Sequence, residues 1–164
     1  MKKAFLALAI VLGATSAHAF TAPAWACNLN FKGEASGFKV ILGNYQYDGK
    51  GTLSCMSPTG ETAEYPVTVK MKAKPLSPQV ALGHMTLTGQ AAEIALFDTN
   101  PESILGTYYV AQAQGAIIGG VGVITATRID LPTMALKVSL QFARGFGVNL
   151  GLNRMEIALD QDRN

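Results

Sequence analysis

The sequence predicts an all-β fold, an antiparallel barrel or sandwich of about eight to ten strands that carries one disulfide. Polar and apolar residues alternate from Cys27 to Leu159, and sustained helical spacing is almost absent. The connections between the alternating runs are too short for the crossovers that parallel strands require. Cys27 and Cys55 are the only two cysteines of the chain, which suits a single bridge.

Residues 1–19 have the layout of a secretory signal peptide. Lys2 and Lys3 form a basic start, the apolar run 4–14 follows, and Ala17-His18-Ala19 is a small-x-small cleavage site. The apolar run is about half the roughly 20 residues that a membrane-spanning helix needs. Cleavage after Ala19 is therefore favoured over a permanent anchor.

Cleavage there leaves residues 20–164, which we expect to form a single β domain with 20–26 as a flexible lead-in. A second small-x-small triplet, 24–26, directly precedes Cys27 and leaves open a lipoprotein acylated at that cysteine. The predicted localisation is exported, either periplasmic or secreted, with the outer membrane as the alternative.

The charge balance argues against nucleic acid as a partner. The chain has 13 basic and 11 acidic side chains, and loss of Lys2 and Lys3 would leave 11 of each. A near-neutral domain without a basic stripe lacks the electrostatic footing for binding nucleic acid or anionic lipid. The abundance of apolar residues, 49%, argues against disorder.

The two cysteines are expected to form a structural disulfide, because export delivers them to an oxidising compartment. Chain entropy gives such a bridge roughly 3 to 4 kcal/mol of stabilisation. A redox or metal-binding pair would favour the closer spacing of a C-x-x-C motif.

The first half of the chain predicts hairpins. Residues 27–32 alternate as a half-buried strand, and a second run begins at 37–42 and continues through 45–47. Asp48-Gly49-Lys50-Gly51 predicts a turn, from which a return strand brings Cys55 back toward Cys27.

A turn at 57–60 precedes the alternating strand 67–73. The lysines of that strand favour a solvated face or a guarded strand edge over a stripe that binds an acidic partner. Prolines break the chain at 75–78, after which 80–88 is predicted to pair with 91–97.

The second half holds the longest polar loop, 98–103, which has room for one helical turn and is a candidate for specificity. Residues 104–126 contain no charged side chain and are rich in glycine from 115 onward. We favour strands here over a membrane or zipper-like helix, and a ligand-binding loop is the third alternative.

A turn at 129–133 leads into the cleanest alternating strand, 134–142. Residues 144–147 are predicted to bend the chain back before a last alternating run, 155–159.

Little of the sequence predicts chemistry. After signal removal His84 is the remaining histidine, and neither a nucleophile system nor a metal cluster can be assembled around it. Two carboxylate pairs, Glu61 with Glu64 and Asp98 with Glu102, allow a hydrolase as a second alternative function. We predict no catalytic residue, no metal and no cofactor.

Candidate contacts with a ligand or partner come from aromatic and loop residues. Tyr45 and Tyr47 are two apart and face one side of their strand, where they either stack on a partner or pack in the core. The full candidate set is Tyr45, Tyr47, Asp98, Asn100 and Tyr108.

Several segments together resemble a family of small exported bacterial glycine-rich β proteins known only as a domain of unknown function. They are Cys27, 37–43, 53–55, 105–108 with the glycine-rich run after it, 136–141 and 147–151. The resemblance implies an envelope protein without an assigned activity.

The predicted function is non-catalytic binding, or a structural role, in the cell envelope, with an envelope protein or a small apolar ligand as partner. A small outer-membrane barrel, and with it membrane association, is the less favoured alternative.

Overall fold

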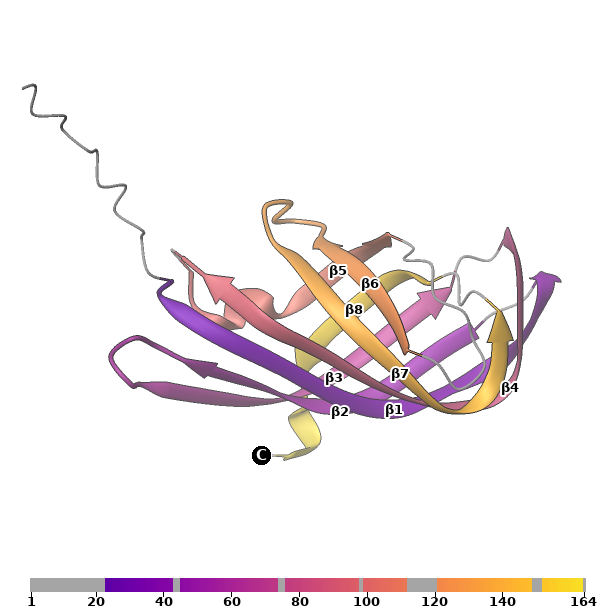
Figure 1. Ribbon diagram of the computed structural model, residues 1–164, viewed down its shortest axis with the longest axis horizontal. Coiled ribbons are helices and arrows are strands. Elements are labelled where there is room, and N and C mark those ends of the chain that lie inside the picture. Colours follow the sequence, from indigo (N-terminus) through magenta and orange to yellow (C-terminus); the bar gives the residue numbers. More distant parts are fainter. Residues whose placement is uncertain are drawn as a thin grey trace, which may run out of the picture.

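The computed structural model describes residues 23–42, 45–73, 76–97, 99–111, 121–148 and 152–163. Eight antiparallel strands close into a barrel, which confirms the predicted fold class and decides it for the barrel (Figure 1). The strands are β1 (Trp25–Leu42), β2 (Tyr45–Met56), β3 (Thr62–Ala73), β4 (Leu76–Leu96), β5 (Gly106–Ala111), β6 (Val121–Arg128), β7 (Ala135–Val148) and β8 (Leu152–Leu159).

The barrel consists of two consecutive Greek keys. Around the wall the strands follow the order β4-β1-β2-β3-β8-β5-β6-β7, after which β7 pairs with β4 again. Each half has the spatial order 4-1-2-3 of a Greek key, first in β1–β4 and then in β5–β8. The keys meet at two seams, β3–β8 and β7–β4.

Four predicted breaks in the chain are wrong, because the strands there are longer than the turn signals suggested. β1 is one strand rather than two, and β2 runs through Asp48-Gly49-Lys50-Gly51 without a turn. β4 likewise spans both of its predicted strands, and β7 continues through 144–147.

Aromatic rings explain why glycines stand inside these strands. A Cβ on Gly49 would lie 2.2 Å from the Tyr47 hydroxyl, and one on Gly89 would lie 2.0 Å from Cζ of Phe31. Each of these two glycines thus leaves space for a ring that packs in the barrel, and neither forms a turn.

Side chains from every strand fill the barrel. Phe31 and Tyr47 meet edge to face with ring centroids 6.0 Å apart, and the Tyr47 hydroxyl donates to the Leu87 carbonyl oxygen at 3.3 Å. The other buried strand residues include Leu29, Leu53, Val67, Val69, Met71, Ala91, Tyr108, Val110, Ile124, Ala126, Leu136, Val138, Leu140, Met155 and Ile157.

The predicted disulfide is present. Cys27 and Cys55 lie directly opposite each other on β1 and β2, and their sulfurs are bonded at 2.01 Å. β1 begins at Trp25, inside the segment expected to be a lead-in. Residues 1–22, including the predicted signal peptide, lie outside the described residues.

The lysines of β3 face solvent, as expected. Lys70 and Lys72 are exposed, whereas Val69 and Met71, which alternate with them, are buried. Closure of the barrel means that β3 is not an edge strand, because β2 and β8 flank it.

The uncharged stretch 104–126 contributes β5 and β6, in line with the preference for strands. Its glycine-rich part, 112–120, lies outside the described residues. In the part of the chain that is described, no helix is both long enough and apolar enough to cross a membrane. The predicted helical turn in the polar loop is a 3-10 helix, Pro101–Ile104.

Candidate functional site

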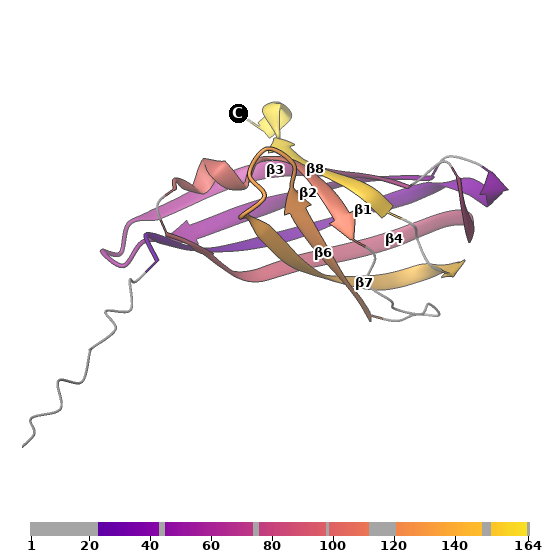
Figure 2. The same cartoon turned by 90° about the horizontal axis from the view of Figure 1, so that it is seen from above.

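The barrel wall opens at one end of the β4–β7 seam. The ladder between these strands ends at Gln90 opposite Ser139, although both strands continue toward the barrel end (Figures 1 and 2). Beyond that point, among the described residues, β4 pairs with β1 alone and β7 pairs with β6 alone. We call this opening, between Ala91–Leu96 of β4 and Ala135–Val138 of β7, the seam notch.

A groove of about 340 Å³ lies in the seam notch. A volume of that size is at the lower end of the range for small-ligand sites. Its lining comes from the end of β4, the loop after it, and the turn that leads into β7. The lining residues are Glu93, Ile94, Ala95, Leu96, Phe97, Thr99, Leu131, Thr133, Met134 and Ala135.

A bulge in β4 shapes one wall of the groove. Cys27 pairs with Ile94 and Leu29 pairs with Ala91, so Ala92 and Glu93 both stand opposite the single residue between. Glu93 has φ +60°, a conformation rare for a residue with a side chain. Bulges bend a strand and redirect its side chains, and here Glu93 becomes an exposed acid at the groove.

Most side chains that line the groove are apolar, and the polar ones are Glu93, Thr99 and Thr133. Phe97 is 50% exposed, and Leu131 and Met134 are half-buried.

Tyr108 supports the groove from the barrel interior. Its hydroxyl donates to the Ile104 carbonyl oxygen at 2.5 Å and lies 3.5 Å from the sulfur of Met134, a lining residue. Burial raises the pKa of Tyr108 above its usual range, so the hydroxyl stays protonated and keeps its role as a donor.

Arg128 ties the two sides of the groove together. Its Nε and Nη2 donate to the Asp130 carboxylate at 2.7 and 2.8 Å, and its Nη1 donates to the Ser103 carbonyl oxygen. The hydrogen bond from Arg128 lowers the pKa of Asp130 below its usual value. The guanidinium thereby fixes the β6–β7 turn against the loop that follows β4.

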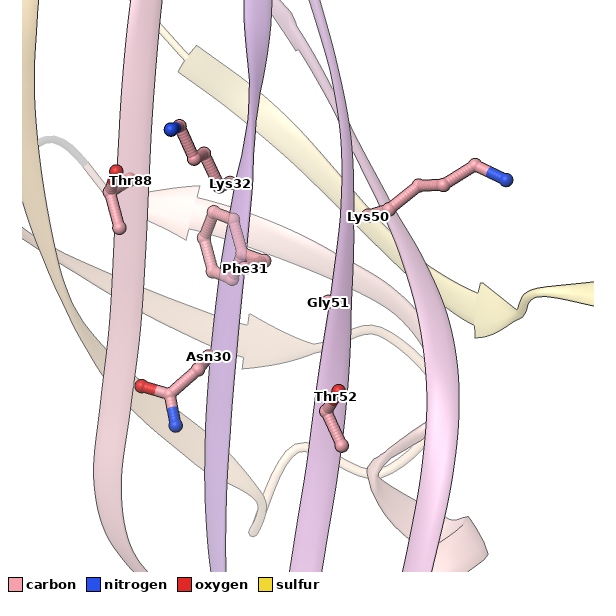
Figure 3. Close-up of a pocket in the computed structure, with 7 residues that line it drawn as sticks. All are labelled: Asn30, Phe31, Lys32, Lys50, Gly51, Thr52 and Thr88. Atoms are coloured by element: carbon pink, nitrogen blue, oxygen red, sulfur yellow. The ribbon is translucent and has the colours of Figure 1, made fainter. Parts of the chain in front are cut away.

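A second hollow of about 340 Å³ lies on the outer wall over β1, β2 and β4 (Figure 3). Lys32 and Lys50 stand opposite each other there, but their side chains extend in opposite directions. Lys50 instead contacts Asp160 at 3.0 Å, so the two cations do not converge on an anion. The hollow is lined by Asn30, Phe31, Lys32, Lys50, Gly51, Thr52 and Thr88.

The structure separates the predicted contact residues. Tyr47 and Tyr108 are buried in the barrel, as the core interpretation of the tyrosines requires. Asn100 is exposed beside Thr99 of the groove, and its carbonyl oxygen accepts the Ser103 N–H. The side chain of Tyr45 and the whole of Asp98 lie outside the described residues.

Of the carboxylates considered for chemistry, the structure describes Glu61, Glu64 and Glu102. Glu61 and Glu64 are both exposed, near the β2–β3 turn. Among the described residues no group of three metal-ligating side chains occurs. His84 lies in β4, and its side chain is not among those described.

The groove was largely missed from the sequence, and one signal could have located it. Residues 91–94 are Ala-Ala-Glu-Ile, in which Glu93 directly precedes the apolar Ile94, and in the structure only Ala91 and Ile94 are buried. Two successive outward residues break the period of two and are typical of a bulge.

Comparisons with known proteins add little. No known family model matches the chain, and no curated protein matches it. One solved structure is similar, a beta-barrel-like, uncharacterized protein from Brucella abortus, at 14% identity and a TM-score of 0.38. The match covers 82% of this chain and 74% of that one. The resemblance to the exported family therefore stays a prediction.

Proposed function

We propose that this protein is an exported cell-envelope barrel that acts by binding, without catalysis, and that the groove of the seam notch is its contact site. The observation that carries the proposal is the opening of the wall at the β4–β7 seam over a groove with mostly apolar side chains, with Phe97 half exposed at its edge. A barrel that served only as a scaffold would gain stability by pairing β4 with β7 along their whole length.

The outer face of the barrel supports a domain in water over an outer-membrane barrel. A membrane barrel presents an apolar band about 25 Å tall to lipid. Here polar side chains are exposed on the described parts of the strands. Examples are Asn30, Lys32, Glu34, Asp48, Lys70, Lys72, Gln90, Thr125, Lys137, Ser139, Arg154 and Glu156.

The location is tested by fractionation of cells that make the full chain. We expect release by osmotic shock of a form that lacks residues 1–19 and carries the disulfide. Extraction that requires detergent, with heat-modifiable mobility on a gel, would support the outer-membrane alternative instead.

The contact site is tested with Nile red, a neutral dye that fluoresces in apolar surroundings. We expect the exported protein to enhance its fluorescence and Ala135→Trp, which fills the groove from an exposed position, to remove the effect. Ser54→Trp adds the same ring to an exposed site on β2 and is the matched control. Equal dye binding by both variants would refute the groove as the site.

A further inference from the structure

We propose that the partner at the seam notch is an extended peptide segment, which adds as a strand to the open edge of β7 and carries a lysine or arginine toward the barrel end. The inference rests on the proposed function, because it names the class of partner that the groove takes.

The open edge of β7 is the first reason. From Ala135 to Val138 this strand pairs with β6 in an unbroken register, so its backbone is regular. The β4–β7 ladder begins only at Ser139, so none of the described strands pairs with the other side of this stretch. Unpaired N–H and C=O groups on a regular edge are a template for an added strand.

The facing edge of β4 is a poor template by comparison. The bulge at Ala92 and Glu93 interrupts its register, and Glu93 has a positive φ. A peptide on β7 would therefore meet β4 through side chains. Ile94, Leu96 and Phe97 supply an apolar wall for every second residue of that peptide.

The acidic side chains around the groove favour a partner that carries a positive charge. The described turns at this end, 57–61, 99–105 and 129–134, contain neither lysine nor arginine, and they carry Glu61 and Glu102 in addition to Asp130, whose charge is balanced by Arg128. Glu93 adds an acid in the groove itself, with no ion pair to any described residue.

The nearest cations do not cancel this acidic surround. Arg128 is held by Asp130, and Lys137 is exposed on the outer face of β7 and does not line the groove. A basic residue at the end of the bound segment would therefore complement the rim.

The test is selection of a phage-displayed library of random linear peptides on the exported protein, with counter-selection on Ala135→Trp. We expect enriched peptides to alternate apolar residues and to include lysine or arginine. Fluorescence anisotropy then measures the affinity of synthetic copies of them.

Backbone methylation decides between strand addition and simple apolar contact. A strand on one edge directs every second N–H to that edge. N-methylation of one alternate set should abolish binding to β7, whereas methylation of the other set should leave the affinity within about twofold. If N-methylation of either alternate set lowers the affinity equally, or if neither set changes it, the inference of strand addition is overturned.

Charge reversal gives an independent readout. Glu93→Lys should weaken the selected peptides by about threefold to fivefold at low salt, the size of an exposed ion pair. Glu64→Lys, at an exposed acid outside the groove, is the matched control and should change the affinity little. Peptides that lack a basic residue, or an equal response to both substitutions, would overturn the charge part of the proposal.

The outcomes also separate this inference from the proposed function. Nile red binding that Ala135→Trp removes, together with a selection that enriches no peptide, would keep the groove as a binding site and reject the strand. If the unmodified protein neither binds Nile red nor enriches any peptide, both the proposed function and the strand addition would be rejected.

Discussion

Gly89→Ala is expected to destabilise the barrel, although alanine normally suits a strand better than glycine. The added Cβ would lie 2.0, 2.3 and 2.6 Å from three ring atoms of Phe31. The ring has little room to move, because Tyr47 packs against it and is held by its own hydrogen bond to β4. Overpacking of this kind costs ~1–3 kcal/mol, against a gain of ~0.5–1 kcal/mol from the loss of glycine flexibility. The net expectation is a loss of about 1–2 kcal/mol.

Urea unfolding with the disulfide intact measures this loss as a lower midpoint at an unchanged slope. Phe31→Leu supplies the decisive second mutation, because leucine lacks the outer ring atoms that the new methyl group would strike. In that background Gly89→Ala should become neutral or stabilising, which corresponds to a coupling energy of about 1–3 kcal/mol.

Gly51→Ala is the matched control on the other side of the same ring. Its Cβ would lie 2.2 Å from the Asn30 carbonyl oxygen and 2.7 Å from Cβ of Phe31, atoms that leucine retains. Phe31→Leu should therefore not rescue it. Additive effects of Phe31→Leu and Gly89→Ala would refute the idea that these glycines exist to make room for rings.

Three further predictions concern the disulfide, a turn and an ion pair. Replacing Cys27 and Cys55 by alanine should lower the free energy of unfolding by ~3–4 kcal/mol, which urea titration measures, and an unchanged midpoint would contradict the chain-entropy account. Gly60→Ala should cost ~1–2 kcal/mol by the same assay purely through its φ of +84°, since a Cβ there meets nothing within 4 Å. Because the pKa of Asp130 is lower in the folded protein, its pair with Arg128 stabilises at neutral pH, and this contribution is lost as the pH falls through that pKa. Arg128→Gln should accordingly flatten the acid side of a profile of stability against pH, and an unaltered profile would contradict this.

The alternation of polar and apolar residues predicted burial correctly where a strand has one solvent-exposed face and one buried face. Val67, Val69 and Met71 are fully buried as the alternation requires, and the same holds for Leu136, Val138 and Leu140. Burial of one face is a local property that each strand carries in its own residues.

The composition of Asp48–Gly51 is typical of a hairpin turn and predicted a break that β2 does not have. Gly49 leaves room for the ring of Tyr47 in its own strand, whereas Gly51 leaves room for the Asn30 carbonyl oxygen and Phe31 Cβ, a relation that exists only once β1 and β2 lie side by side. Turn signals in a barrel with interior rings are thus ambiguous until the cross-strand neighbours are known.

The candidate site was foreseen only at its margin, in the loop that holds Asn100. The groove depends on where the β4–β7 ladder stops, which is a relation between strands about 50 residues apart in the sequence. No local pattern reports the end of such a ladder, although the bulge at Glu93 marks one wall of the groove.

The two seams between the Greek keys differ at this end of the barrel in a way that bears on function. At the β3–β8 seam the ladder reaches Leu159, and the next residue, Asp160, donates its N–H to the Pro66 carbonyl oxygen. The buried carboxylate of Asp160 also accepts a hydrogen bond from Lys50 of β2, so polar contacts continue this seam beyond the last ladder pair. At the β4–β7 seam the ladder instead stops at Ser139, and no described hydrogen bond closes the remainder. An opening there leaves the hairpins of both keys intact, so a partner can occupy the notch without disturbing the pairing on which the fold depends.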